Sequence, residues 1–472
     1  MPEITASSQR RIIGNFKREI LRVKQLEDPP LQELIDYKND LVTQNKRDVH
    51  LVLLEYLRYR ADNARISDEI NTFRQLERDL DEQDEDDQKL IGNWLKESDT
   101  EKFEVLRKDL KVNPQREVAI ITCDGFLING NRRRKVIETL YSETSDPKYQ
   151  TMRVVILPSD DTDDDLGDGG APTIEDIQRI EYAYQVQQSG HSDYTGINRA
   201  LQYRGNMELG FSLEDQLRRD PQYHDLTLRK FQAAIKKIHK DFLNPLQECD
   251  AYLDYFDRPG LYTNVSKTGG SSGGRWQAFI DWSNTYNTHL KEERSLIGLG
   301  LDRNQAAKIK EIAYKVIRQR ELKTAGKVHS FMRKLPKILK KPEIRRELMK
   351  ITDERVLRRL PENERVDPEG NPYDPKTLDN LWSGNYGEHI INTAKKCIRL
   401  LEYETETEKP KTLLEAALAK LEHDDMDPES VSTLENNDCI ELCEKIQERS
   451  AELFTEFDHN RMRLNQLGNR NQ

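Results

Sequence analysis

The chain has 472 residues, of which 34% are charged and 35% hydrophobic, and its formal net charge is −11. Its mean hydropathy is −0.86, and no uncharged apolar run approaches the roughly 20 residues of a membrane-spanning helix. This composition excludes an integral membrane protein, a collagen-like chain and a fully disordered chain. At roughly 150 residues per domain, the length predicts several domains with modest, mostly helical cores.

Cysteine usage favours a reducing compartment. The five cysteines are scattered and form no Cys-x-x-Cys pair. The opening segment carries charges without an apolar block behind them, so we expect no secretory signal. We therefore expect a cytoplasmic protein with reduced thiols and no membrane association.

The first elements in chain order are expected to be helical, then extended. Residues 1–47 are predicted as an N-terminal helical extension, broken at Pro29-Pro30. An apolar run from His50 indicates a strand. Residues 67–110 return to a helical pattern with an acidic interruption at 81–87, and Ser67 is expected to cap its start.

The clearest β signal lies at 117–128, where two apolar runs flank an Asp124-Gly125 turn and predict a hairpin. Asn129-Gly130-Asn131 then leads into a helix, and Met152 begins another strand. Residues 48–160 are thus expected to form a small α+β domain.

The remainder is predicted to be mostly helical. An acidic, glycine-rich loop spans 161–172, and Thr173 with Asp176 comes close to a capping box at the next helix. The expected segments after this loop are a helical region at 173–260, a Gly/Ser-rich loop at 261–275, a basic helical region at 276–360 and a C-terminal helical region at 361–472.

The loop before the helix at 132–140 has the chemistry of an anion site. A helix N-terminus offers unpaired N–H groups, and Gly130 lets the backbone approach a ligand. Arg132 and Arg133 add forked donors suited to phosphate oxygens. The alternative is a hairpin, a turn glycine and solvated arginines, although arginines in a first helical turn oppose the helix dipole.

The stretch ITCDGFLINGNRRRKVIETL at 121–140 resembles the central motif of the ParB/sulfiredoxin superfamily, in which Asp-Gly is followed by Gly-x-Arg-Arg. LEYLRYRADNARI at 54–66 is similar to the first box of that family, and TIEDIQRIEYAYQ at 173–185 to the third. The three elements occur in the family's order, and the resemblance covers residues 48–200.

The resemblance implies a domain that binds CTP or ATP with Mg²⁺. It implies that Gly130, Asn131, Arg132 and Arg133, next to the Asp124 turn, hold phosphates. Asn63 and Arg65 would line the same site. Glu175, Asp176 and Arg179 would lie near the triphosphate or the metal, with Asp176 as the metal ligand.

Two departures from the family pattern matter. Asn131 stands where sulfiredoxins have their cysteine, which argues against sulfinic acid reductase activity. Asp176 stands where the family often has Asn. A carboxylate there repels phosphate unless a cation intervenes, so it marks either a metal site or a loss of binding.

Two regions are candidates for nucleic-acid contact. In ParB-type proteins a helix-turn-helix follows the third box, and Thr227 here could cap a recognition helix carrying Arg229, Lys230, Lys236, Lys237 and Lys240. The alternative is ordinary helical packing with solvated lysines.

The second region runs from Arg303 to Arg346 and holds fifteen basic and three acidic residues, a net charge of +12. This suits a phosphate backbone or, alternatively, an acidic protein surface. The candidate contact residues in it are Lys308, Lys310, Lys315 and Arg318.

The sequence thus predicts a nucleotide-binding, ParB-like switch that acts on DNA and self-associates as a homo-oligomer. A second hypothesis is a nuclease or phosphotransferase of the same fold that uses Glu175 or Asp176 with magnesium. A third is a nucleotide-independent adaptor or scaffold.

Overall fold

The computed structural model describes residues 31–35, 37–38, 40–158, 172–187, 196–218, 221–224, 226–266, 275–352, 356–430 and 433–468. The chain divides into two compact units, Met1–Ile398 and Arg399–Gln472. The predicted helix before residue 31, the acidic loop at 161–171 and most of the Gly/Ser-rich loop lie outside the described residues.

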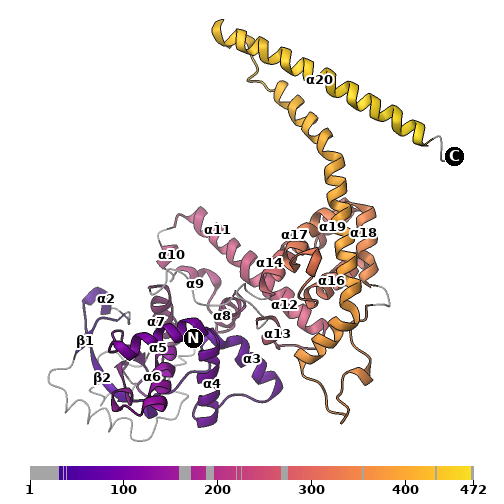
Figure 1. The fold of residues 1–472 in the computed structure, drawn as a ribbon. Coiled ribbons are helices and arrows are strands. Elements are labelled where there is room, and N and C mark those ends of the chain that lie inside the picture. The colour runs from indigo at the N-terminus through magenta and orange to yellow at the C-terminus, as the bar shows by residue number, and fades with distance from the viewer. Residues whose placement is uncertain are drawn as a thin grey trace. The chain divides into compact units, whose positions relative to one another are not determined.

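The four strands found among the described residues lie in the N-terminal part of the chain, drawn in indigo and purple in Figure 1. They are β1 (Gln32–Glu33), β2 (Arg47–Leu53), β3 (Ala119–Ile121) and β4 (Thr151–Ile156), and they form one sheet in the order β1-β2-β4-β3. β3 and β4 are parallel, whereas the other two pairs are antiparallel. The parallel pair requires a crossover, which α6 (Asn131–Thr144) provides.

Both faces of the sheet are covered, because alternate residues of β4 enter different cores. Met152 and Val154 join a cluster with residues of α3 (Ser67–Leu76), α4 (Glu85–Glu97), α5 (Thr100–Val112) and α6. Val155 joins a second cluster with Ile177 and Ile180 of α7 (Ile174–Gln187). The sheet therefore lies between α3–α6 on one face and α7 on the other.

The expected helix at 67–110 is three helices, and the acidic interruption separates the first two. Asp84 caps α4 and Asp99 caps α5, each accepting from backbone N–H groups of the first turn. The prediction that Ser67 caps a helix is wrong. Ser67 is already helical, and the capping side chain upstream is that of Asn63, at the short helix η2 (Ala64–Ile66).

The described part of the N-terminal extension, residues 31–47, is not the continuous helix predicted from the sequence. It contains β1 and one helical turn, α2 (Asp40–Thr43). Asp40 accepts hydrogen bonds from Arg47 Nε at 2.6 Å and from its Nη2 at 3.1 Å. This buried ion pair and the pairing of β1 with β2 join the segment to the sheet.

The predicted hairpin is present as a tight turn. Gly125 has φ +90° and its N–H donates to the Thr122 carbonyl at 2.9 Å. The return run is held by single bridges, from Leu127 to Ile121 and from Phe126 to Arg58, rather than by a regular strand.

Beyond the sheet the described chain is helical, so the mixed α+β class with a small sheet and a mostly helical remainder is confirmed. The next helices are α8 (Gly196–Glu208), α9 (Leu213–Arg218), α10 (Pro221–His224), α11 (Leu228–Ile238), the π-helical turn η4 (His239–Leu243), α12 (Asn244–Tyr255) and α13 (Thr263–Ser266). They are followed by α14 (Trp276–Thr285), η5 (Tyr286–Leu290), α15 (Glu293–Leu299), α16 (Arg303–Arg318), η6 (Lys323–Ala325), α17 (Val328–Lys340), α18 (Pro342–Leu348) and η7 (Met349–Thr352).

The C-terminal part has two long helices, α19 (Pro375–Leu421) and α20 (Thr433–Gly468), preceded by η8 (Glu362–Glu364) and separated by η9 (Pro428–Ser430). α19 begins in the first compact unit and ends in the second. No helix within the described ranges is both long and apolar enough to span a bilayer.

Candidate functional site

A cavity of about 490 Å³ lies between the segment after β2, helix α7 and helix α8. Its volume falls in the range of small-molecule sites, roughly 300–1,000 Å³. Charged and amide side chains from these three segments and from α3 line it, including Arg60, Asp62, Arg74, Gln178, Glu181 and Arg204. The segments that resemble the first and third boxes both line this cavity, whereas the central motif at Gly130–Arg133, which was expected to hold the phosphates, does not.

Arg60 and Glu181 are the buried ionic groups of this cavity. Arg60 Nη1 lies 3.3 Å from Glu181 Oε1, and Nη2 of the same guanidinium pairs with Asp62. Within the described part of the chain, Arg60 Nε is buried and has no hydrogen-bond partner. Nε of Arg134, Arg275 and Arg320, which do not line the cavity, is likewise without a partner among the described residues, so this atom does not by itself mark a ligand site.

Burial sets the protonation behaviour of this pair. It raises the pKa of Glu181 to about 7, with a further contribution from the negative charge of Asp62 and opposition from Arg60. Burial alone would lower the pKa of Arg60, but the charges of Asp62 and Glu181 outweigh it and raise that pKa. Arg60 is therefore a permanent cation, whereas Glu181 titrates near neutral pH.

Arg204 contributes a third guanidinium from α8. Its Nη1 lies 2.7 Å from Asp250 Oδ2, and its Nη2 donates to the Tyr262 hydroxyl at 2.6 Å. These contacts tie the cavity wall to α12 and to the chain just before α13. Arg204 thus connects α8 to the helical region that follows.

The two faces of α7 have different roles. Ile174, Ile177, Gln178 and Glu181, which recur at helical spacing, line the cavity. The predicted residues Glu175, Asp176 and Arg179 do not line it.

Asp176 completes the capping box expected from the sequence. Its Oδ2 accepts from Thr173 N at 2.9 Å, and Thr173 Oγ1 accepts from Asp176 N at 3.2 Å. Arg179 instead donates to the Lys38 carbonyl. These contacts give Asp176 a local capping role, whereas Arg179 joins α7 to the chain before α2.

Gly130 is explained by packing. Its φ of +83° suits glycine, and a Cβ there would lie 2.7 Å from Ala119 Cβ and 3.1 Å from Met152 Cε. The following residue, Asn131, is buried, and its Oδ1 has no hydrogen-bond partner among the described residues. Neither residue lines the cavity.

Arg132 and Arg133 do not converge on one site. Arg132 Nη2 lies 3.8 Å from Asp99 Oδ2 of α5, whereas Arg133 Nη2 lies 2.5 Å from Glu117 Oε2 before β3. Their side chains are only 12% and 11% exposed, and burial lowers the pKa of Arg133. The predicted phosphate grip by this pair is therefore not assembled, because each guanidinium already pairs with a carboxylate of a different element.

The remaining predicted residues lie in backbone turns. Asn63 Oδ1 accepts from Arg65 N at 3.0 Å, and the Arg65 carbonyl accepts from Asn198 Nδ2 at 2.9 Å. Asp124 is buried and accepts from the Thr122 hydroxyl within the hairpin turn. Asn63 and Arg65 flank cavity-lining residues, and the charge of Arg65 acts on Glu181, but neither lines the cavity itself.

Four residues that line the cavity were not predicted from the sequence: Arg60, Gln178, Glu181 and Arg204. The signal for the α7 residues was present in the spacing, since 174, 177, 178 and 181 share one helical face. Nothing local marks Arg60 or Arg204. In the described ranges no group of three or more His, Cys, Asp or Glu side chains has the geometry to hold a metal ion alone.

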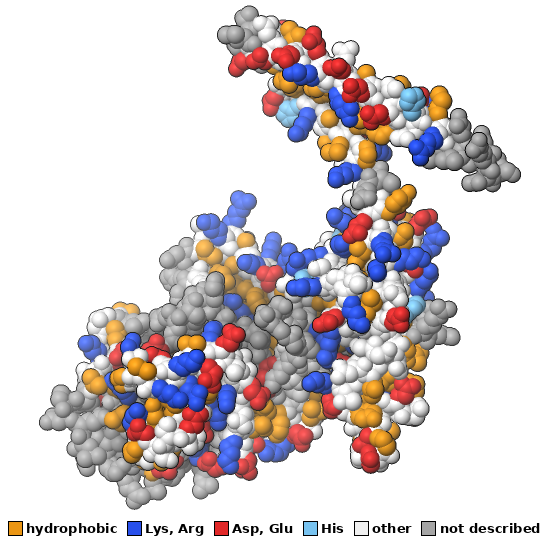
Figure 2. All heavy atoms as spheres, viewed as in Figure 1, with side chains coloured by type: hydrophobic (Ala, Val, Ile, Leu, Met, Phe, Trp, Pro, Cys, Tyr) orange, Lys and Arg blue, Asp and Glu red, His pale blue; other side chains and the backbone are white. Residues whose placement is uncertain are grey.

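The region in which a helix-turn-helix was predicted includes α9, α10 and α11. Tyr203, Leu217, Phe231 and Ile238 join these helices and α8 in a small core. α11 begins at Leu228 after Thr227, as predicted, although the Thr227 side chain makes no capping bond. Figure 2 shows Lys and Arg side chains gathered over α11.

The basic residues of α11 and the start of η4 are exposed. They are Arg229, Lys230, Lys236, Lys237 and Lys240, and no acidic residue occurs between Leu226 and Lys240. An exposed helix whose charged side chains are all basic has the charge pattern of a surface that contacts a phosphate backbone.

The basic stretch at 303–346 requires a correction, because Lys315 and Arg318 are buried rather than at a nucleic-acid surface. They are 3% and 4% exposed. Lys315 Nζ donates to the Ile351 carbonyl, and Arg318 Nε lies 2.9 Å from Asp379 Oδ1. Lys310 pairs with Glu248 at 3.4 Å, which leaves Lys308 as the exposed member of the four.

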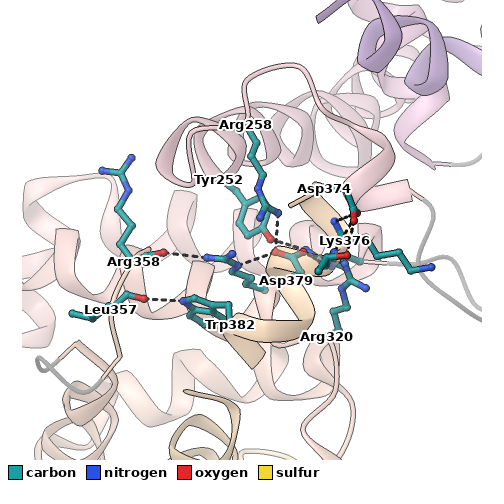
Figure 3. Close-up of polar contacts among 12 residues, drawn as sticks. Tyr252, Arg258, Arg320, Leu357, Arg358, Asp374, Lys376, Asp379 and Trp382 are labelled. Carbon is teal, nitrogen blue, oxygen red and sulfur yellow. Dashed lines mark hydrogen bonds and ion pairs between the residues drawn. The ribbon is translucent and has the colours of Figure 1, made fainter. Parts of the chain in front are cut away.

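Asp379 is the centre of the cluster that holds Arg318. Its two oxygens also pair with Arg258 at 2.7 Å, Arg275 at 3.1 Å and Arg320 at 3.0 Å, and Figure 3 shows Arg258 and Arg320 reaching it from different segments. One carboxylate near the start of α19 thus ties together four arginines. This explains part of the excess positive charge of the region as internal structure.

Comparison with known proteins gives no family assignment. No protein-family model, curated protein or solved structure matches the chain.

Proposed function

We propose that the chain is a nucleotide-binding switch that acts on DNA, and that CTP or ATP occupies the cavity between the first-box segment, α7 and α8. The observation that carries this proposal is a cavity of about 490 Å³ lined by three arginines, Arg60, Arg74 and Arg204. The resemblance to the ParB family supports the choice of ligand. We propose that the residues donating hydrogen bonds to the phosphates are Arg60, Arg74 and Arg204, in place of Arg132 and Arg133.

The charge of the lining favours a nucleotide bound with magnesium over the bare triphosphate. Three arginines line the cavity together with four carboxylates, those of Asp62, Glu82, Glu181 and Glu208. Carboxylates repel free phosphates, but Mg²⁺ is commonly held by one or two carboxylates plus the phosphates of its ligand. Asp62 and Glu82 are the residues we propose for this role, and the metal would neutralise phosphate charge there.

The proposed output is a change at α8 and in the helices after it. A ligand that pairs with Arg204 competes with Asp250 and Tyr262 for its guanidinium. The ligand would therefore bind more tightly when α8 is arranged so that Arg204 is released from Asp250 and Tyr262. A switch requires such a difference in binding free energy between two states. α8 shares its small core with α11, so the basic helix is the element we expect to respond.

DNA is the proposed partner of α11. The side chains that would contact its phosphates are Arg229, Lys230, Lys236, Lys237 and Lys240. Self-association is part of the same proposal. Two copies of the chain would present two basic helices to one duplex, as dimeric helix-turn-helix proteins do.

Equilibrium binding of labelled CTP and ATP, with and without Mg²⁺, tests the nucleotide claim. We expect magnesium-dependent binding by the wild type and by Arg132→Ala, and weakened binding by Arg204→Ala. Circular dichroism of each variant checks that the fold is retained. If Arg132→Ala lost as much binding as Arg204→Ala, the nucleotide would bind at the start of α6 instead. If the wild type bound no nucleotide, the adaptor hypothesis would be favoured.

A further inference from the structure

α20 has a pattern of apolar residues that a solitary helix does not need. Counting from Cys439, positions at alternating spacings of four and three residues are Cys443, Ile446, Ser450, Leu453, Phe457, Asn460 and Leu464. Most of these are apolar, and this period of 3.5 residues is the signature of a coiled-coil seam.

Six large apolar side chains between Thr433 and Arg463 are exposed: Ile440, Leu442, Ile446, Phe454, Phe457 and Met462. Ile446 is 45% exposed, Phe457 43% and its neighbour Phe454 73%. Cys439 and Cys443 are exposed as well. Figure 2 shows these hydrophobic side chains interleaved with charged ones along α20. Exposed apolar residues in such a continuous series mark an interaction surface.

The charges of α20 differ between its two ends. From Thr433 to Glu448 it carries five acidic residues and one lysine, a net charge of −4. From residue 459 to 468 it carries Arg461 and Arg463 and no acidic residue. A parallel pair of α20 helices would place the acidic halves side by side, whereas an antiparallel pair places each acidic half beside a basic end.

We infer that α20 pairs with α20 of a second copy of the chain as an antiparallel coiled coil. The seam aligns Ile446 of one copy with Phe457 of the other, near the middle of the interface. The same alignment brings Arg449 beside Glu456 of the second copy, twice in each dimer. Within one helix Arg449 already lies 2.7 Å from Glu452 and 3.7 Å from Glu456, so its guanidinium is positioned on that flank.

This inference deepens the self-association in the proposed function by naming the surface and its occupant. Its test needs neither nucleotide nor DNA, so its failure is distinguishable from failure of the proposed site. The test is sedimentation of the full chain over a range of concentrations. We expect a dimer, and a roughly 100-fold or greater rise in its dissociation constant for Ile446→Glu, because a carboxylate would enter an apolar seam.

Thr455→Glu is the matched control, since it adds the same charge on the outer face of the helix and should leave the dimer intact. Circular dichroism of both variants checks helicity. Oxidation of the native cysteines tests orientation, because antiparallel pairing separates the two copies of Cys439 by about 37 Å at a rise of ~1.5 Å per residue. A dimer that forms no Cys439–Cys439 disulfide supports the inference. A monomer at all concentrations, an intact Ile446→Glu dimer or a ready Cys439 disulfide would overturn it.

Discussion

The carboxylate of Glu181 on α7 lies 3.3 Å from the guanidinium of Arg60, and both side chains are buried in the wall of one cavity. This contact joins the segment after β2 to the helix on the other side of that cavity. It is the relationship from which the proposed binding site is built, and it predicts a pH dependence.

Replacing Glu181 by Gln should change how stability depends on pH. Burial raises the Glu181 pKa from about 4.5 to about 7, so this group favours the folded state below its ordinary pKa and loses that contribution as the pH rises through 7. The variant lacks this titration. The difference in free energy of unfolding, Glu181→Gln minus wild type, should therefore rise by up to roughly 3 kcal/mol as the pH increases from about 4.5 to about 7. Urea unfolding at several pH values measures it, and a difference that does not vary with pH would contradict the buried pair.

Gly130→Ala should destabilise the sheet domain by about 1–3 kcal/mol, because of its positive φ and the approach of Ala119 and Met152. The control is Gly384→Ala in α19, where nothing lies within 4 Å of the added Cβ. That change should stabilise by up to ~1 kcal/mol. Chemical unfolding of both variants gives the comparison. If the two substitutions changed the free energy of unfolding equally, Gly130 would be needed for the approach of a ligand and not for packing.

Asp379→Asn should be among the most destabilising single substitutions in the helical region. It removes the only carboxylate that pairs with Arg258, Arg275, Arg318 and Arg320 in the described structure, and breaking a buried ion pair costs about 3–5 kcal/mol. The Arg318 guanidinium lies 4.5 Å from the ring centre of Trp382, so tryptophan fluorescence reports on the transition.

Asp374→Asn is the matched control for that experiment. Asp374 accepts from the N–H groups of Lys376 and Thr377 at the start of α19, and Asn caps helices about as well as Asp. We expect a loss below about 1 kcal/mol. A comparable loss in the two variants would show that Asp379 acts only through the helix terminus.

Charge reversal on α11 should weaken DNA binding. For Lys236→Glu with Lys237→Glu we expect lower affinity and a salt slope reduced by about 2, since each phosphate contact contributes ~0.9. Fluorescence anisotropy with a labelled duplex at several salt concentrations measures both. The pair Lys89→Glu with Lys102→Glu, on exposed positions of α4 and α5, is the control. An unchanged slope in the α11 variant removes this helix from the interface.

The elements that sequence reasoning predicted well are those set by local signals. β2, the turn at Gly125, α6, β4 and the capping box at Thr173 each depend on residues within one short segment. The prediction of a helix at residues 31–47 was wrong because β1 is only two residues long and forms through pairing with β2. No local sequence pattern indicates that pairing.

The site was predicted less well than the fold. The sequence placed Arg132 and Arg133 on one ligand because they are adjacent, but their carboxylate partners come from different elements and draw them apart. Lys315 and Arg318 were predicted at the surface from charge alone. Their burial depends on Ile351 and Asp379, which the fold brings close from later in the chain.

The most direct test of the nucleotide claim is to fill the cavity without disturbing its walls. Gly205 lines the cavity, and nothing lies within 4 Å of a Cβ added there. Isothermal titration of Gly205→Leu with CTP and ATP in the presence of Mg²⁺ should show loss of binding, while Gly384→Leu, on an exposed face of α19, should bind as the wild type does. Wild-type affinity in Gly205→Leu would place any bound nucleotide elsewhere and contradict the account.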